Sequence, residues 1–302
     1  MPGRETTIAV PASYDFGAAL SFVRESPSAV LESVDGQTYR RAWRTERGFE
    51  LVSVERAGSG LRVRVEGSRA DAESLAHAVQ RVRHIFSLDI DADAFQELVV
   101  TDPILARLVG GDRHARPVLI ADPFECLVWA IIGQQVGVGF ARTLRQALVH
   151  MVGHEATFEG SRFRIMPEAQ ALACADEEAL RALHFSRAKI RYLRTAAQAV
   201  AEGALDFAAL ATLPWAQALA ALTSFPGIGP WTAEMVLMRG LGIRSVWPAA
   251  DLGLRRALAH AQGGSGPVSE ACARALAVSW SGWEAWVAYF AWCSLTRHTK
   301  GP

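Results

Sequence analysis

The stretch LTSFPGIGPWTAEMVLMRGLGIRSVWPAADLGLRR, residues 222–256, predicts two short helices joined by the turn Pro226-Gly227-Ile228-Gly229. The two glycines permit a tight turn with positive φ and leave its amides uncovered by side chains. Pro230 suits the first position of the second helix, where an N–H would have no partner within the helix. The free amides at this helix start predict a contact with one anion, such as a phosphate. The tetrapeptide alone is also typical of an ordinary connection between helices.

The composition indicates a globular protein with a sizeable core. The chain has 302 residues, of which 50% are hydrophobic, enough for two domains or one large domain. Lys plus Arg and Asp plus Glu both number 31, so bulk charge gives no argument for a nucleic-acid partner. The four cysteines form no C-x-x-C pair, which disfavours zinc ribbons and cysteine-ligated iron–sulfur clusters and is typical of reduced thiols. Without a signal peptide or a run of ~18 apolar residues, the chain is expected in the cytoplasm and not in a membrane.

Positive charge is concentrated in two places. Residues 181–201 contain five basic side chains and no acidic one. A second group lies around Asp251 in the sequence and consists of Arg239, Arg244, Arg255 and Arg256. Each group is compatible with a solvated helix face or with a surface for nucleic acid, and the nearby glycine turn favours the second interpretation.

The pattern of the chain predicts an α+β, mostly helical protein in two parts. Residues 1–90 are expected to form a small antiparallel α+β domain, because short segments rich in β-branched and aromatic residues alternate with hairpin-type turns. Its strands are expected at Thr6–Ala12, Gln37–Trp43, Gly48–Ala57 and Leu61–Glu66, and its helices at Tyr14–Arg24 and Asp71–Phe86. Residues 91–302 are expected to be helical, with the two-helix hairpin at 215–239. The helices are expected at Phe124–Gly133, Ala141–Val152, Pro167–Ala182, Arg187–Glu202, Trp215–Thr223, Pro230–Arg239, Leu252–His260 and Ser281–Leu295.

Four features make the interpretation specific. They are Tyr14-Asp15-Phe16 with Phe22; Asp122-Pro123-Phe124-Glu125 followed by Ile131-Ile132-Gly133-Gln134-Gln135-Val136; FPGIGPWTAE at 225–234; and Trp280, Trp283 and Trp292 near the C-terminus. With Asp251 at the family's distance after the hairpin, they resemble the helix-hairpin-helix DNA glycosylase superfamily, and among its members the bacterial 3-methyladenine DNA glycosylase II type. The resemblance covers nearly the whole chain and implies that the helical core has two subdomains.

The resemblance implies a role for each group of residues. A base must be extruded from the duplex before its glycosidic bond can be reached, and a wedge, here Gln134 and Gln135, fills the gap. The base pocket would consist of Phe22, Trp231, Met235 and Trp292. The hairpin would bind a DNA phosphate through Gly227, Gly229, Trp231 and Thr232. It would hold a monovalent sodium or potassium ion on the backbone carbonyls of Thr223, Phe225 and Ile228. Met235 and Gln135 stand where some relatives have an aromatic residue and a leucine, which leaves the substrate range open.

Asp251 is the candidate catalytic residue. Cleavage of an N-glycosidic bond develops positive charge on the deoxyribose, and a fixed carboxylate stabilises this charge in a site emptied of water. Asp251 also precedes an apolar, basic helix, where an aspartate is typical of an N-cap. The two roles are compatible because capping orients the carboxylate. Glu234, the other acid of the stretch, is expected on an exposed helix face, and Trp280 and Trp283 are expected to pack in the core.

The expected activity is excision of alkylated purines, such as 3-methyladenine or 7-methylguanine, from duplex DNA in base excision repair. Trp231 stands where members that also cut the backbone carry a lysine, so no Schiff base is expected there and the enzyme is predicted to be monofunctional. No cofactor is expected to be required, the partner is duplex DNA, and the protein is expected to be a monomer. The alternatives are a glycosylase for oxidised or deaminated bases and a non-catalytic DNA-binding protein that keeps the hairpin.

Overall fold

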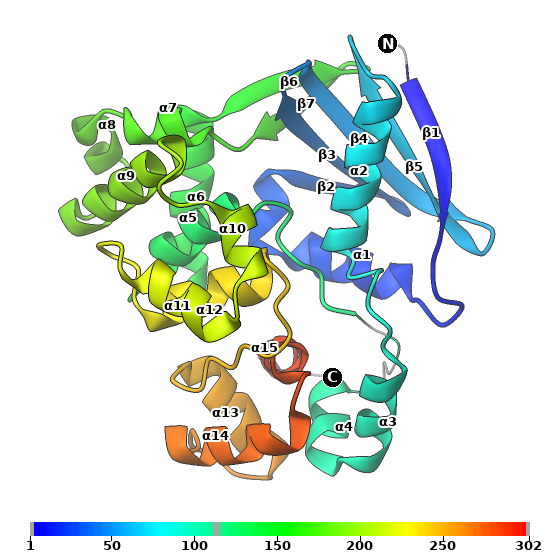
Figure 1. The fold of residues 1–302 in the computed structure, drawn as a ribbon, viewed down its shortest axis with the longest axis vertical. Helices are drawn as coiled ribbons and strands as arrows, with labels where there is room; N and C mark the ends of the chain where they lie inside the picture. The colour runs from blue at the N-terminus through cyan, green and yellow to red at the C-terminus, as the bar shows by residue number, and fades with distance from the viewer. Residues whose placement is uncertain (1–2, 111–113, 115, 300–302) are drawn as a thin grey trace.

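The computed structural model describes residues 3–110, 114 and 116–299, which form an antiparallel sheet domain and a helical core (Figure 1). Within these residues the larger sheet has five strands in the order β1-β5-β4-β3-β2, each antiparallel to its neighbours. The strands are β1 (Gly3–Ala9), β2 (Glu32–Asp35), β3 (Thr38–Thr45), β4 (Gly48–Ala57) and β5 (Gly60–Gly67). Helices α1 (Phe16–Glu25) and α2 (Ala72–Ile85) pack against this sheet, and a 3-10 turn, η1 (Pro27–Val30), follows α1.

The strict alternation of LRVRVEG decides which face of the sheet is buried. Along β5, Leu61, Val63 and Val65 are fully buried, whereas the arginines between them are exposed. Successive strand residues point to opposite faces, so these apolar side chains meet α1 and α2. The four expected strands are confirmed, with β1 beginning and ending three residues earlier than predicted. The sequence did not predict β2, which pairs with β3 across a tight turn at Gly36, where φ is 56°.

The helical core contains two groups of helices (Figure 1). One group, which is continuous in the sequence, comprises α5 (Pro123–Gly133), α6 (Val138–Val152), α7 (Ala169–Ala173), α8 (Glu177–Ala182), α9 (Arg187–Ala201), α10 (Phe207–Thr212), α11 (Trp215–Thr223) and α12 (Pro230–Met235) with the π-helix η2 (Val236–Gly240). The other group comprises α3 (Asp93–Thr101), α4 (Pro103–Val109), α13 (Leu252–Ala261), α14 (Glu270–Ala277) with η3 (Val278–Trp280), and α15 (Glu284–Thr299). Because α4 packs against both α13 and α15, segments from before and after the first group close the second one.

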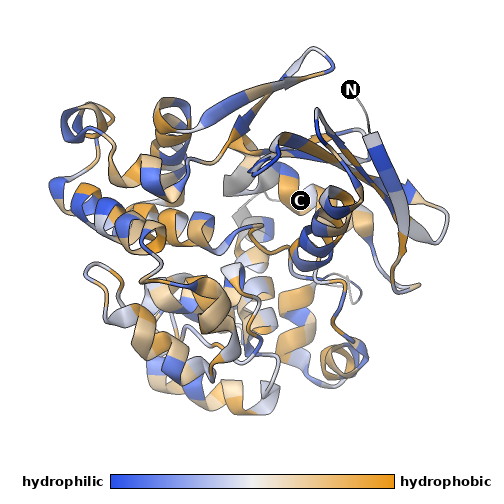
Figure 2. Ribbon diagram, turned by 45° about the horizontal axis from the view of Figure 1, so that its top comes forward, coloured by the Kyte–Doolittle hydropathy of each residue, from blue (hydrophilic) through white to orange (hydrophobic). Residues whose placement is uncertain are grey.

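The predicted helices are largely confirmed. The segment 167–182 is divided into α7 and α8, and the segment 230–239 changes from α-helix to π-helix at Val236. The sequence did not predict α3, α4, α10 or α14. Hydrophilic and hydrophobic residues alternate along most of the helices (Figure 2). None of the helices in the described part of the chain has the length and apolar character that a membrane crossing requires.

A two-stranded hairpin in the helical part was also not predicted. Strands β6 (His154–Phe158) and β7 (Ser161–Ile165) pair across Glu159 and Gly160, which have φ of 47° and 81°. Phe158 and Ile165 pack on Ala42 and Leu51, which lie on the sheet domain. The hairpin therefore connects the helical core to the sheet.

A buried ion network makes a second connection between the sheet and the helical core. Arg41 of β3 bonds to Glu32 of β2 at 2.6 Å and to Glu125 of α5, which Arg145 of α6 contacts at 2.5 Å. All four side chains are almost completely buried. Burial alone would raise the pKa of Glu125, but Arg41 and Arg145 hold this pKa below its usual value. The network therefore keeps a buried carboxylate charged at the junction of the two parts.

Candidate active site

Asp251 accepts hydrogen bonds from three different segments of the chain. It is the N-cap of α13, where its Oδ1 accepts from the Leu254 amide at 2.6 Å. The indole nitrogen of Trp292 on α15 donates to the same oxygen at 2.9 Å. The indole nitrogen of Trp231 on α12 donates to Oδ2 at 2.9 Å. The carboxylate is partly buried and its orientation is fixed on both oxygens.

This geometry brings together Asp251, Trp231 and Trp292, for which the sequence analysis predicted different roles. Asp251 is both the helix cap and the fixed carboxylate, as expected. Trp231 and Trp292, predicted as walls of a base pocket, use their N–H groups to hold the carboxylate. A Cβ at Gly253 would lie 3.1 Å from Asp251 Oδ1 and 3.4 Å from Trp292 Cδ1, so the glycine permits this close packing. Such an arrangement can stabilise positive charge that develops beside it without first reorienting.

The other two predicted pocket residues lie in different surroundings. Phe22 is half-buried and contacts Tyr289 of α15 at 5.0 Å between ring centroids, one helical turn before Trp292. The Arg239 guanidinium lies 5.5 Å from the Phe22 ring and 5.2 Å from the Tyr289 ring. Met235 is 7% exposed within the hydrophobic core. The structure thus brings Phe22 to α15 and buries Met235 among core residues.

The arginines near Asp251 in the sequence do not form one basic surface. Arg239 donates to the Val118 carbonyl at 2.9 Å, and Arg255 donates to the Val268 carbonyl at 2.6 Å. Arg244 lies 4.4 Å above the Trp283 ring. Arg256 is exposed. Arg239 and Arg255 each use one donor of the guanidinium for a backbone carbonyl, so the interpretation of this group as a nucleic-acid surface stays a prediction.

The hairpin has one glycine with positive φ and one without. Gly227 has φ of 87°, and a Cβ there would lie 2.2 Å from the Tyr192 ring. Gly229, the N-cap of α12, has φ of −83°, and no atom lies within 4 Å of its Cβ position. The expectation of positive φ is therefore confirmed for Gly227 only. The open space at Gly229 leaves room for a group that approaches the amides of α12.

Thr232, another predicted phosphate contact, is 2% exposed, and its hydroxyl accepts a hydrogen bond from the Gln134 side chain at 2.9 Å. The Trp231 side chain is bonded to Asp251. Both residues therefore offer a phosphate their backbone amides and not their side chains. A phosphate contact of this kind does not depend on the base sequence.

The two predicted wedge residues point in different directions. Gln134 donates its amide to the Gly227 carbonyl at 2.8 Å and to the Thr232 hydroxyl, so its side chain faces the hairpin. Gln135 is exposed, and its φ of 56° is in the left-handed region that non-glycine residues rarely adopt. The structure does not place Gln134 beside Gln135 on the surface, and only Gln135 has the exposure that a wedge requires.

The carbonyls expected to hold a monovalent ion lie at the end of α11 and in the turn that follows it. The Phe225 carbonyl accepts from the Ile228 amide at 3.1 Å. In the turns and loops of the described residues, the Thr223 and Ile228 carbonyls accept no backbone hydrogen bond. Oxygen ligands of this kind fit a hard cation.

Glu234 is buried, contrary to the sequence-based expectation of an exposed residue. It is 8% exposed on α12. Burial raises the pKa of Glu234 to about 7; Arg274 opposes this rise, whereas Glu270 and Asp251 add to it. The protein therefore carries a second acid, with a pKa raised by burial, in the helix that supplies Trp231.

Glu234→Gln is expected to make the stability of the protein less dependent on pH. The folded protein binds this proton more tightly than the unfolded chain, so the wild type loses stability as pH rises from the usual value of 4.5 to about 7. The variant cannot ionise and should avoid this loss, which is about 1–3 kcal/mol. Denaturant unfolding at pH 5 and pH 8 measures the difference, with Glu97→Gln on the exposed side of α3 as the control. Equal pH dependence in the wild type and both variants would contradict the assignment.

Trp280 and Trp283 are core residues, as predicted. Trp280 is 1% exposed and donates to Asp102, the N-cap of α4, at 2.8 Å. Trp283 packs on Phe95 and Trp286.

In the basic run of residues 181–201, Lys189 and Arg194 donate to backbone carbonyls, whereas Arg181, Arg187 and Arg191 are exposed.

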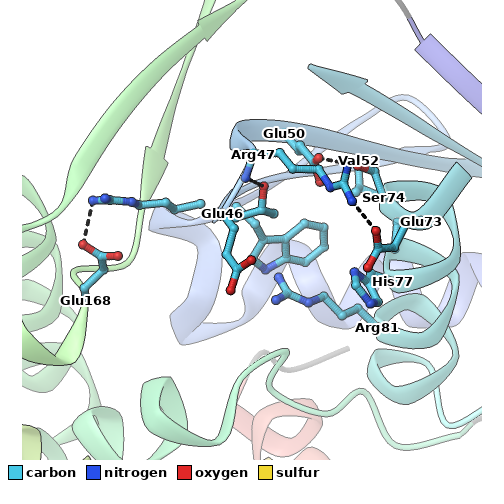
Figure 3. A pocket seen from close by; sticks show the side chains of 13 residues that line it. Glu46, Arg47, Glu50, Val52, Glu73, Ser74, His77, Arg81 and Glu168 are labelled. Carbon is cyan, nitrogen blue, oxygen red and sulfur yellow. Dashed lines mark hydrogen bonds and ion pairs between the residues drawn. The ribbon is translucent and has the colours of Figure 1, made fainter. Parts of the chain in front are cut away.

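A cavity of about 590 Å³ lies between β3, β4 and α2 in the sheet domain (Figure 3). Its charged side chains are mostly paired, as Arg44 with Glu168 and Arg47 with Glu73. Arg81 lies over the Trp43 ring at 5.2 Å. None of the predicted site residues lines this cavity.

Two family models match the chain. Residues 128–281 match the HhH-GPD superfamily of base excision DNA repair proteins, and residues 6–116 match the AlkA N-terminal domain. The chain therefore belongs to the HhH-GPD superfamily of base excision DNA repair proteins.

Its relatives include proteins named as DNA-3-methyladenine glycosylases. A DNA-3-methyladenine glycosylase of Bacillus subtilis is 27% identical over 71% of this chain and 71% of its own. A probable bifunctional transcriptional activator/DNA repair enzyme AlkA of Mycobacterium tuberculosis is 31% identical over 93% of this chain, which spans about half (54%) of that longer protein. The fold is shared with a 3-methyladenine DNA-glycosylase from Archaeoglobus fulgidus, with a TM-score of 0.82, 24% identity and coverage of 95% and 97% of the two chains.

Proposed function

We propose that the protein is a monofunctional DNA glycosylase that removes alkylated purines, of the 3-methyladenine and 7-methylguanine type, from duplex DNA. The observation that carries the proposal is the Asp251 carboxylate, which two indole N–H groups and one backbone amide hold beside the hairpin. A helix cap alone would need only the amide. The names of the relatives in Bacillus subtilis and Archaeoglobus fulgidus support the same activity.

The residues suggest the following course of reaction. The hairpin amides bind a phosphate while the damaged nucleotide is extruded and Gln135 fills the gap. The bond between the base and the deoxyribose breaks, and its electron pair leaves with the base. Asp251 stabilises the positive charge that develops on the sugar. A water molecule then adds to the sugar carbon that carried the base and loses a proton to solvent. The product is an abasic site.

Cationic bases suit this site better than neutral ones. An N-alkylated purine already carries a positive charge, so it leaves without first gaining a proton. The faces of Trp292 and Phe22 can attract such a base by about 0.5–2 kcal/mol. A neutral lesion such as hypoxanthine would benefit from a proton donor, so we expect slower removal.

A direct test is incubation of methylated duplex DNA with the protein, followed by alkali and gel electrophoresis. Strand breaks that appear only after alkali would support the proposal. Breaks in duplexes with an oxidised or deaminated base, but not in methylated DNA, would favour a glycosylase for oxidised or deaminated bases. Binding without any abasic site would favour the non-catalytic alternative.

No covalent enzyme–DNA adduct is expected to be trapped by borohydride. Trp231 occupies the place of the lysine that would form a Schiff base, and its side chain is bonded to Asp251. The sequence contains only two lysines, Lys189 and Lys300. A trapped band of the size of the complex would contradict the monofunctional assignment, and its persistence in a Lys189→Met variant would point to an amine elsewhere.

We further propose that the enzyme works as a monomer in the cytoplasm and requires no cofactor. A sodium or potassium ion on the carbonyls of Thr223, Phe225 and Ile228 would offset the partial negative charge of these oxygens when a phosphate binds at the hairpin. The division of the chain into residues 1–90 and 91–302 belongs to the same proposal.

A further inference from the structure

Lys189 caps the C-terminus of α5, the helix that precedes Gln135. Its Nζ donates to the carbonyls of Ile131 at 3.1 Å, Ile132 at 2.9 Å and Gln134 at 2.6 Å. The last carbonyls of a helix have no partner within the helix, and a cation there is favourable for the helix dipole. The ammonium group has three donors, and each binds one of these carbonyls.

The residue type at this position is unusual for the chain. Of 31 basic residues, only Lys189 and Lys300 are lysines. A guanidinium is planar and its donors form a fixed fork, whereas an ammonium directs three donors toward converging acceptors. Three carbonyls around one point therefore require a lysine here and do not merely require a positive charge.

Gln134 connects the same helix end to the hairpin. Its side-chain nitrogen donates to the Gly227 carbonyl at 2.8 Å, in the turn, and to the Thr232 hydroxyl at 2.9 Å, in α12. Both donors of this amide are used, so the segment before Gln135 is fixed to both sides of the turn.

Helix α9 holds both ends of this connection. It supplies Lys189 to the end of α5, and it supplies Tyr192, whose ring fills the space beside Gly227. Helices α5, α9 and α12 lie together in the structure (Figure 1). Gln135 follows directly with its left-handed φ of 56°, so the backbone of the exposed residue is determined by fixed neighbours.

We infer that Lys189 and Gln134 are positioning residues that lock Gln135 to the hairpin, so that the wedge enters the duplex at a fixed distance from the bound phosphate. The inference rests on the proposed role of Gln135 in base extrusion. Neither residue needs to touch DNA, because each acts through the backbone of residues 131–135. A misplaced wedge would weaken extrusion and leave phosphate binding intact, since positioning groups contribute through preorganisation.

The test compares Lys189→Met, Lys189→Arg and Gln134→Met with the wild type. Gln198→Met on α9, where the side-chain amide donates to Glu202 at 2.8 Å, is the matched control. Three quantities are measured: affinity for undamaged duplex by anisotropy, extrusion by fluorescence of 2-aminopurine next to an abasic analogue, and single-turnover excision from methylated duplex. The first two do not depend on glycosylase activity.

We expect both methionine variants to lose about tenfold in the extrusion equilibrium and in excision, the scale for lost hydrogen bonds to charged or buried groups, with duplex affinity within about twofold of the wild type. Lys189→Arg should fail to restore extrusion, because its charge is retained but its geometry is not.

Full rescue by arginine, or an equal loss of duplex affinity, would overturn the inference in favour of a phosphate contact. Wild-type fluorescence in Gln134→Met and Lys189→Arg would also overturn it, even if Lys189→Met does not fold. Absence of excision by the wild type itself would contradict the proposed function and leave the fluorescence comparison to decide the positioning role.

Discussion

Asp251→Asn is expected to lower single-turnover excision by about 10²- to 10³-fold or more, the scale for loss of a preorganised electrostatic group, while binding of duplex DNA persists. The substitution removes the charge and also abolishes at least one hydrogen bond. Trp231, Trp292 and the Leu254 amide are all donors to the carboxylate. In either orientation the NH2 group of asparagine faces at least one of these donors, so the side chain also loses its fixed position.

The control for the loss of a helix cap is Asp206→Asn. Asp206 caps α10 through the amides of Ala208 at 2.8 Å and Ala209 at 3.2 Å, and it is not part of the site. This variant should change stability only slightly and leave excision intact. Excision by Asp251→Asn within tenfold of the wild type would rule out the catalytic assignment.

Trp292→Phe and Trp292→Ala are expected to separate two functions of one side chain. Phenylalanine keeps an aromatic face but cannot donate to Asp251, so excision of charged and neutral lesions should fall alike, by about tenfold or more. Alanine also removes the face, which should cost cationic bases a further factor of about 2 to 30. Single-turnover rates for 7-methylguanine and hypoxanthine in each variant measure both effects.

Trp280→Phe is a matched control, because Trp280 also donates its indole N–H to an aspartate that caps a helix, Asp102 of α4. Excision should persist in this variant. Equal proportional losses for both lesions in Trp292→Ala would mean that the tryptophan acts only through Asp251. Unchanged rates would remove Trp292 from the site.

The features that were predictable from the sequence depend on local chemistry. The alternation of residues 61–67, the turn at Gly227 and the position of Asp251 before an apolar helix each follow from a few adjacent residues. The β6–β7 hairpin is short and carries a single turn signal at Glu159-Gly160, too little to stand out within a helical region.

The direction of individual side chains was not predictable. Trp292 is 41 residues from Asp251, and Gln134 is 93 residues from Gly227, so neither contact leaves a local pattern. Gln134 and Gln135 are adjacent and chemically identical, yet the backbone turns one inward and the other outward. Glu234 is polar in sequence, but its place on α12 is set by the helices that cover it. Contacts of this kind depend on how distant segments pack.

The ion network of Glu32, Arg41, Glu125 and Arg145 has a consequence for truncation of the protein. A fragment that begins at residue 91 would retain Glu125 and Arg145 but lose Arg41, the partner from the sheet. Glu125 would keep Arg145 as an ion-pair partner, but it would lose the second of the two guanidinium groups that hold its pKa below the usual value. The sheet domain thus supplies one of the two guanidinium groups around Glu125, so a fragment cut near residue 90 is expected to be less stable than the same helices in the full chain.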